Sequence, residues 1–146
     1  MMSSFDLLVQ ARKRALLSKK PNTKVGAILA DKDNNIIFEA SNDYIQPLYT
    51  DPSLESEAER SFYSEHAERR LIFSAARSGF CSFHDVTLVV THFPCCDCAR
   101  AIILIGINKI IVSSSDADNT FVKKWDHNTS VSKKMLEYGK VSILFI

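Results

Sequence analysis

Three of the four cysteines in this 146-residue chain lie within four positions, in the segment FPCCDC at residues 93–98. Pro94 suits the first turn of a helix, where its missing N–H is no loss, so Cys95 and Cys98 should lie in that turn. Residues three apart on a helix are separated by about 60° around its axis, so these two thiols share a face while Cys96 points elsewhere. Because a helix N-terminus favours the thiolate, the form that binds metal, the pattern predicts two metal ligands. A CxxC pair alone also suits a redox site.

A third ligand and a catalytic acid are offered by the segment HAE, residues 66–68, at the expected start of another helix. His66 and Glu68 are two positions apart, about 200° around a helix, so only at the helix tip can both reach a point near the axis. Two thiolates and one imidazole give zinc three protein ligands and leave a fourth position for water, the pattern of a catalytic site. Zinc lowers the pKa of that water to about 7, and Glu68 is then placed to accept the proton. Together the two motifs favour a zinc site over a redox pair.

Hydrophobic periodicity and turn signals predict the elements that position these residues. The expected helices cover residues 3–20 (with Ser4 as the cap), 66–77, 94–105 and 131–138, with a short helix near 54–62 inside the long segment 41–64. The expected strands are a hairpin of 25–30 and 36–40, followed by 86–92, 109–113 and 141–146. A hairpin followed by alternating helices and strands implies right-handed crossovers and a mixed sheet covered on both faces. We therefore predict one α/β domain over 1–146, with three layers (α/β/α) and a five-stranded mixed sheet.

The bulk composition is that of an ordinary globular protein, with 46% hydrophobic residues, 24% charged residues and a formal net charge of +1. The apolar run 101–107 is too short for a membrane helix, which needs about 20 residues, and the segment MMSSFDLL lacks the pattern of a secretory signal. We therefore expect a cytoplasmic location and no membrane partner. In a reducing compartment the cysteine cluster favours a metal or catalytic site over disulfides. Cys81 and Cys96 are expected to be small buried apolar groups.

The two motifs, HAE at 66–68 and PCCDC at 94–98, resemble the H-x-E and P-C-x-x-C signature of zinc deaminases that act on cytosine or adenine. PNTKVGAILA (21–30) and FPCCDCARAIILIGINKIIV (93–112) are similar to the first strand and the cysteine helix of deoxycytidylate deaminases. The chain thus resembles the cytidine/deoxycytidylate deaminase superfamily over residues 5–146. The resemblance implies a cytidine-deaminase-like fold, one zinc ion per chain and hydrolytic deamination of a cytosine nucleotide or nucleoside. The best single substrate is dCMP, converted to dUMP with release of ammonia.

The same resemblance implies a role for each matching residue. It makes His66, Cys95 and Cys98 the zinc ligands and Glu68 the proton carrier between water, the ring nitrogen and the departing ammonia. It places the substrate among Asn42 at the sugar, Gly26 and Ala27 along the base pocket, and the backbone N–H of Ala67 at the base carbonyl. It further implies a small-molecule nucleotide or nucleoside partner and a homo-oligomer.

Two positions depart from the family pattern. Arg69 and Arg70 follow the HAE motif, where a small or apolar residue and then asparagine are common, and Asp43 follows Asn42 where glycine is usual. Either arginine, or Lys24, is a candidate to bind a phosphate, although two arginines on a helix also suit a solvated face. An acidic residue beside a phosphate is unfavourable unless it points away.

Other interpretations stay open at this point. A relative acting on tRNA adenosine, guanine or a free nucleoside would carry the same zinc motifs, but an RNA partner should leave a basic groove. The net charge of +1 and the four acids in 51–59 argue against nucleic acid. A non-enzymatic zinc-stabilised interaction domain would usually supply four protein ligands, and only three are evident. His92 either lines the pocket mouth or is a polar residue satisfied at a strand end.

Overall fold

The centre of the fold is a mixed sheet of five strands in the order β2-β1-β5-β6-β7. The computed structural model describes residues 1–45, 57–114 and 126–146. The strands are β1 (Gly26–Ala30), β2 (Ile36–Ser41), β5 (Thr87–Val90), β6 (Lys109–Val112) and β7 (Ser142–Phe145). Strand β1 is antiparallel to both β2 and β5, whereas β5, β6 and β7 are parallel. The predicted five-stranded mixed sheet is confirmed.

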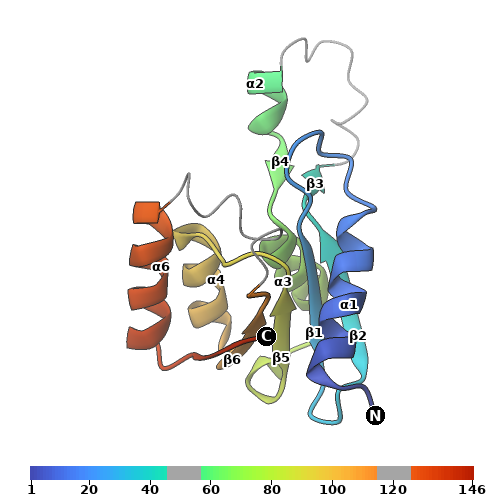
Figure 1. Ribbon diagram of the computed structural model, residues 1–146, viewed down its shortest axis with the longest axis vertical. Coiled ribbons are helices and arrows are strands. Elements are labelled where there is room, and N and C mark those ends of the chain that lie inside the picture. The colour runs from blue at the N-terminus through green and yellow to red at the C-terminus, as the bar shows by residue number, and fades with distance from the viewer. Residues whose placement is uncertain (46–56, 115–125) are drawn as a thin grey trace.

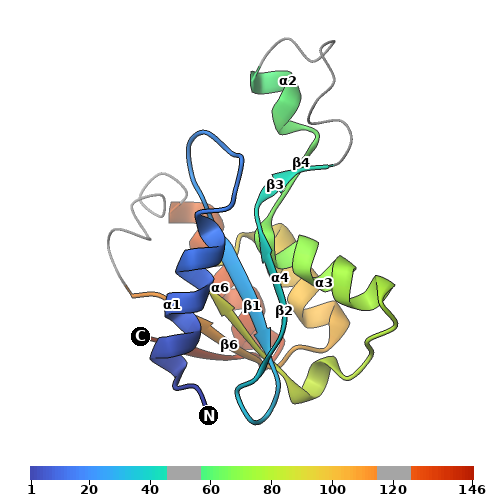
Figure 2. The ribbon, with the colours of Figure 1, turned by 90° about the vertical axis from the view of Figure 1, so that its right-hand side faces the viewer.

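Helices cover both faces of this sheet, as Figure 2 shows. The described residues form the helices α1 (Ser4–Ala15), α2 (Glu57–Ser61), α3 (Ala67–Arg77), α4 (Cys96–Ile105) and α6 (Asp126–Tyr138), with a 3-10 turn at Phe83–Asp85. On one face, α1 packs its buried leucines and Ala11 on the sheet. On the other face, α3 and α4 share a larger core with Leu136 of α6, which lies beside α4 (Figure 1). This arrangement confirms the three-layer α/β/α prediction.

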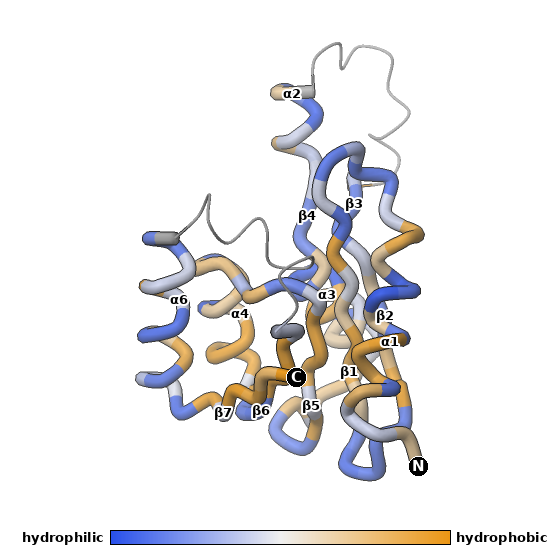
Figure 3. Tube along the Cα trace, in the orientation of Figure 1, coloured by the Kyte–Doolittle hydropathy of each residue, from blue (hydrophilic) through white to orange (hydrophobic). Residues whose placement is uncertain are grey.

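Strand β1 shows how the two cores divide. All five of its residues are buried, because Ala27 and Leu29 face the α3–α4 core while Ile28 and Ala30 face α1. This alternation follows from the two-residue period of a strand. Figure 3 shows the same concentration of apolar residues along the neighbouring strands β5 and β6. Among the described residues, no helix is both long and apolar enough to cross a membrane.

The first helix differs from its prediction at both ends. It begins at residue 4 and its N-cap is Ser3, not Ser4, because Ser3 and Asp6 form a reciprocal capping box. It ends at Ala15 instead of continuing to residue 20. Beyond it the Ser18 hydroxyl donates to the main-chain oxygen of Asn42 at 2.5 Å, which draws the chain into a loop against the end of β2. The segment 18–25 is therefore a loop at the edge of the sheet.

The long predicted connection after β2 contains structure that the sequence analysis did not anticipate. Strands β3 (Asp43–Tyr44) and β4 (Ser64–Glu65) pair antiparallel as a second, two-stranded sheet. Helix α2 lies within the expected 54–62 helix, and residues 46–56 are outside the described ranges. Figure 1 shows α2 beyond the end of the main sheet. The small sheet brings the end of β2 beside the start of α3.

Candidate active site

The N-termini of α3 and α4 meet at the three predicted metal ligands. His66 is the N-cap of α3 and Cys95 is the N-cap of α4, both with extended backbone, and neither side chain makes a capping hydrogen bond. Cys98 lies in the first turn of α4 and is buried. The Sγ atoms of Cys95 and Cys98 lie 3.4 Å and 3.5 Å from Nδ1 of His66. Two helix tips therefore aim three donor atoms at one point.

The position of Cys95 corrects one detail of the sequence analysis. Cys95 precedes the helix instead of lying within its opening turn. An N-cap residue keeps a non-helical backbone while its carbonyl accepts the first helical bond, and the Cys95 oxygen accepts from the N–H of Ala99 at 2.8 Å. The two thiols converge because one lies on the cap and the other on the first turn.

The donor set fits a zinc ion. The ligand atoms of His66, Cys95 and Cys98 all lie within 4.8 Å of one another. Sulfur and nitrogen atoms bound to one tetrahedral zinc, at about 2.3 Å and about 2.0 Å from the ion, are about 3.6 Å apart. The observed distances of 3.4 Å and 3.5 Å are close to that separation. Three such ligands leave one position of the tetrahedron for water or substrate.

The other two cysteines are not part of this donor set. The Cys96 thiol is turned away and donates to the main-chain oxygen of Asn128 at 3.2 Å. It is half-buried and hydrogen-bonded, so it is not simple apolar filler. Cys81 is exposed, and the expectation that it is buried is wrong. Both results follow from position, since Cys81 lies in the turn after α3 and Cys96 faces α6.

The charges of the donor groups are coupled. A hydrogen bond from Cys98, opposed by burial, lowers the pKa of the Cys95 thiol to about 4. The hydrogen bond to Cys95 raises the pKa of His66 to about 9, and the same thiolate together with burial raises the pKa of Cys98. In the metal-free protein this is a thiolate–imidazolium pair, so the site already holds a negative sulfur that a cation can bind.

Glu68 lies beside the donors without joining them. It is the second residue of α3 and only 3% exposed. Burial is the main cause that raises the pKa of its carboxyl group, opposed by the nearby charge of His66. A carboxyl group whose pKa is raised holds a proton more readily than an exposed one, which suits a group that accepts and returns protons. The structure thus places Glu68 beside the three donors, and its role as proton carrier stays a prediction.

Three further contacts hold the start of α3 in place. The N–H of His66 donates to Oε1 of Glu65 at 3.0 Å, and Glu65 forms an ion pair with Arg69 at 3.1 Å. Nη1 of Arg70 donates to the main-chain oxygen of Ser41 at 2.7 Å, which ties α3 to the end of β2. The two arginines after the HAE motif thus stabilise the position of His66.

Helix α6 holds the start of α4. Oδ1 of Asn128 accepts from the N–H of Cys96 at 3.0 Å, and so caps α4 from another helix. The fully buried hydroxyl of Ser132 donates to the main-chain oxygen of Pro94 at 2.6 Å. Neither role was predicted from the sequence. Asn128 precedes the expected helix 131–138 and Ser132 lies inside it, and neither residue carries a local signal of such a role.

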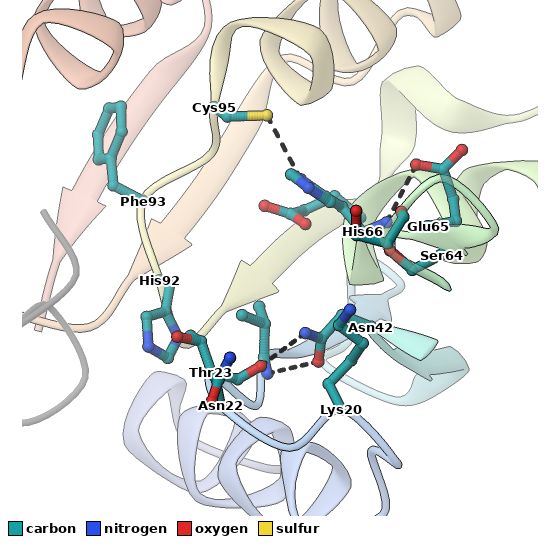
Figure 4. Close-up of a pocket in the computed structure, with 13 residues that line it drawn as sticks. Lys20, Asn22, Thr23, Asn42, Ser64, Glu65, His66, His92, Phe93 and Cys95 are labelled. Carbon is teal, nitrogen blue, oxygen red and sulfur yellow. Dashed lines mark hydrogen bonds between the residues drawn. The ribbon is translucent and has the colours of Figure 1, made fainter. Parts of the chain in front are cut away.

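A pocket of about 360 Å³ opens beside the donor atoms (Figure 4). Its lining residues are Lys20, Asn22, Thr23, Val25, Asn42, Ser61, Ser64, Glu65, His66, Glu68, His92, Phe93 and Cys95. The Asn42 amide accepts from the N–H of Val25 at 2.8 Å and donates to the main-chain oxygen of Thr23 at 2.7 Å. A carboxamide has two donor hydrogens and two acceptor lone pairs, so these bonds leave one of each for a ligand.

The other three residues predicted to contact the substrate are not part of the described pocket lining. Gly26, Ala27 and Ala67 are not among the described residues that line the pocket. A Cβ on Gly26 would lie 1.9 Å from the main-chain oxygen of Ala11, so close approach of α1 explains a glycine inside this strand. Ala27 and Ala67 belong to the α3–α4 core. Contacts from their main chains to a substrate stay predictions.

His92 both lines the pocket and has a polar partner at the end of its strand, so the two interpretations drawn from the sequence both hold. It lines the pocket, and its Nδ1 lies 2.8 Å from the hydroxyl of Thr91. That hydroxyl is buried and accepts from the N–H of Gly26 at 3.1 Å. His92 is therefore held at the end of β5 by a residue that also connects β5 to β1.

The three-layer α/β/α fold brings one histidine, two cysteines and a buried glutamate together at paired helix N-termini, and the donor set suits a zinc ion with three protein ligands. Residues 3–114 match the family model described as the cytidine and deoxycytidylate deaminase zinc-binding region. The chain belongs to this family, which confirms the resemblance drawn from the two motifs.

Individual relatives agree with the assignment. A probable deoxycytidylate deaminase of Caenorhabditis elegans is 30% identical over 137 residues, which cover 90% of this chain and 63% of that protein. An uncharacterized deaminase in the luxG 3' region of Aliivibrio fischeri is also 30% identical, over 88% of this chain and 83% of that protein. The chain thus spans less than two thirds of the length of the nematode relative.

Solved structures show the same fold. The dCMP deaminase of cyanophage S-TIM5, in complex with dCMP and dUMP, superposes with a TM-score of 0.77 at 20% identity, covering 100% of this chain and 99% of that one. Cytidine deaminase from Burkholderia pseudomallei gives a TM-score of 0.51 at 22% identity, covering 75% and 81%. At these identities the likeness confirms the cytidine-deaminase-like fold.

Proposed function

We propose that the protein is a zinc-dependent hydrolytic deaminase of a cytosine nucleotide or nucleoside, with dCMP, converted to dUMP and ammonia, as the expected substrate. The observation that carries the proposal is the buried carboxyl group of Glu68 beside the His66, Cys95 and Cys98 donors at the wall of a pocket. A buried carboxyl group beside a three-ligand site is placed to carry protons to and from a group in the fourth position, whereas a structural zinc site usually has four protein ligands. Family membership and the named deoxycytidylate deaminase relative support the choice of reaction.

The residues divide the chemistry as follows. Zinc, when held by His66, Cys95 and Cys98, supplies a water activated near neutral pH. Glu68, beside those donors, would take up a proton on its carboxylate and return protons to the ring nitrogen and to the departing amino nitrogen. Water and the cytosine base thereby become uracil and ammonia. Burial of Glu68 keeps bulk water away from this exchange.

The substrate contacts belong to the same proposal. Asn42 lines the pocket and keeps one donor and one acceptor for a sugar hydroxyl. The main chain of Gly26, Ala27 and Ala67 is proposed to contact the base. A cytoplasmic location and a homo-oligomer complete the expectation, and sedimentation of the purified protein would measure the subunit number.

The test is an ammonia-release screen with zinc-loaded protein. The compounds are dCMP, CMP, deoxycytidine, cytosine, adenosine, guanine and a tRNA anticodon stem. We expect dCMP to give the highest kcat/KM. Activity confined to adenosine, guanine or the tRNA stem would contradict a cytosine substrate. A zinc-loaded protein that releases no ammonia from any of the seven would contradict deaminase function.

A further inference from the structure

We propose that Lys20 recognises the negative charge of the substrate, so that the pocket selects a phosphorylated nucleoside over the corresponding nucleoside. This inference rests on the proposed deaminase function and assigns a specificity-determining residue within its pocket. The ligand class is a nucleoside monophosphate whose base lies at the zinc donors and whose phosphate lies at the opposite end.

Lys20 lies at the end of the pocket opposite the zinc donors. Figure 4 shows Cys95 and His66 at one end of the pocket, and Lys20, Asn22, Thr23 and His92 gathered at the other. A base whose amino group is directed at the zinc donors must extend its sugar and phosphate toward this second end. Among the described lining residues, Lys20 is the one lysine or arginine.

The three cations suggested by the sequence do not belong to the described pocket lining. Arg69 pairs with Glu65 and lies over the ring of Phe73, with its guanidinium carbon 5.6 Å from the ring centroid. Arg70 donates to the main-chain oxygen of Ser41. Lys24 is exposed and is not among the described lining residues. The phosphate candidates named from the sequence therefore give way to Lys20.

Partly buried hydrogen bonds hold the loop that carries Lys20 against the pocket. The N–H of Lys20 donates to the Ser18 hydroxyl at 3.1 Å, and that hydroxyl donates to the main-chain oxygen of Asn42 at 2.5 Å. Nζ of Lys20 lies 4.7 Å from the centroid of the Tyr44 ring. A cation held over an aromatic face is partly oriented before a ligand arrives, which lowers the entropy lost on binding.

The acidic residue that follows Asn42 is not part of the described pocket lining. Asp43 is buried, accepts from the N–H of Tyr44 at 2.8 Å, and is not among the described lining residues. Of the carboxylates among the described lining residues, Glu65 pairs with Arg69 and Glu68 lies at the zinc end. Within the described lining, the Lys20 end therefore combines a cation with the neutral polar groups of Thr23 and Asn22.

The test compares a charged and an uncharged form of the same substrate. We would measure kcat/KM for dCMP and deoxycytidine in wild type, Lys20→Met and the matched control Lys19→Met. Lys19 is exposed, adjacent and outside the described lining, so its loss removes the same net charge without touching the pocket. We expect Lys20→Met to lose about 10- to 100-fold in kcat/KM for dCMP, as for a lost charge-assisted contact, and to keep deoxycytidine turnover. Lys19→Met should resemble wild type with both.

Equal losses for dCMP and deoxycytidine, or no loss for dCMP, would overturn the role of Lys20. A second arm uses the product pair dUMP and deoxyuridine as binding probes in calorimetry, and it does not require turnover. If wild type releases no ammonia from these two substrates or from any other compound of the screen, the proposed function fails, and the charge preference is decided by this arm alone. Weaker dUMP binding in Lys20→Met, with deoxyuridine unchanged, supports the inference; unchanged dUMP binding overturns it.

Discussion

Removing the Ser132 hydroxyl should disturb the zinc donors from a distance. Ser132 lies on α6 and is fully buried, and its hydroxyl donates to the main-chain oxygen of Pro94 at 2.6 Å. Pro94 is itself buried and immediately precedes Cys95. In Ser132→Ala the Pro94 oxygen loses this donor at a site that water does not reach freely.

The size of the effect follows from that geometry. A buried acceptor left without its partner costs about 1–3 kcal/mol. Alanine is a better helix former than serine by about 0.5 kcal/mol, which opposes the loss. Ser130→Ala is the matched control, because Ser130 is exposed on the same helix and shares the change in helix propensity. We expect the free energy of unfolding of Ser132→Ala to lie about 1–3 kcal/mol below that of Ser130→Ala.

Two measurements check this prediction. Urea unfolding of the metal-free proteins gives the difference in free energy of unfolding. In thermal unfolding, each kcal/mol of lost stability should lower Tm by about 2–4 °C. Competition with a chelator gives zinc affinity, which should fall by about 10- to 100-fold in Ser132→Ala, the usual cost of removing support behind metal ligands. If both variants match wild type in stability and in zinc affinity, α6 does not hold the cysteine loop and the reasoning is refuted.

Three other variants test separate parts of the structure. Ser3→Ala should destabilise the protein by about 1 kcal/mol through loss of the α1 N-cap. The hydrogen bonds from Ser3 lower the pKa of Asp6, so they stabilise the fold above the unfolded pKa near 3.8, and this stabilisation is lost as the pH falls through the folded pKa. The stability difference between wild type and Ser3→Ala, measured by urea unfolding, should therefore shrink in acid. A difference that does not change with pH would count against this bond. Gly26→Ala would put a Cβ 1.9 Å from the Ala11 oxygen, so thermal unfolding should show a loss of at least about 1–3 kcal/mol, and an unchanged Tm would contradict the close contact with α1. Cys96→Ser should keep one zinc per chain by metal analysis, since its thiol faces α6; loss of the metal would show that Cys96 is a ligand.

The zinc donors and Glu68 could be predicted because their spacing is local. Each motif occupies a few residues at the start of one helix, and the chemistry demands those residue types at those separations. The sheet could be predicted for a similar reason, since strand and helix periods alternate along the chain. Bringing the two motifs together required only that consecutive α/β units pack on one sheet.

The supporting residues could not be predicted because their partners are distant in sequence. Asn128 and Ser132 bind groups 32 and 38 positions away, and nothing in their neighbourhood marks them. Hydrophobic periodicity placed Lys20 at the end of an expected helix over 3–20, whereas α1 ends at Ala15 and the Ser18 hydroxyl donates to the main-chain oxygen of Asn42. The residues expected to end the helix therefore form a loop, fixed by a tertiary hydrogen bond, in which Lys20 lines the pocket.

The central claim is tested most directly by Glu68→Gln, with zinc content and ammonia release measured on the same sample. Glutamine keeps the shape of the side chain but cannot carry the proton, and Glu68 is not one of the three donors. We predict one zinc per chain in both proteins and a loss of about 10²- to 10⁴-fold in dCMP turnover in the variant, the usual contribution of a general acid–base. Near-wild-type ammonia release from zinc-loaded Glu68→Gln would contradict the account.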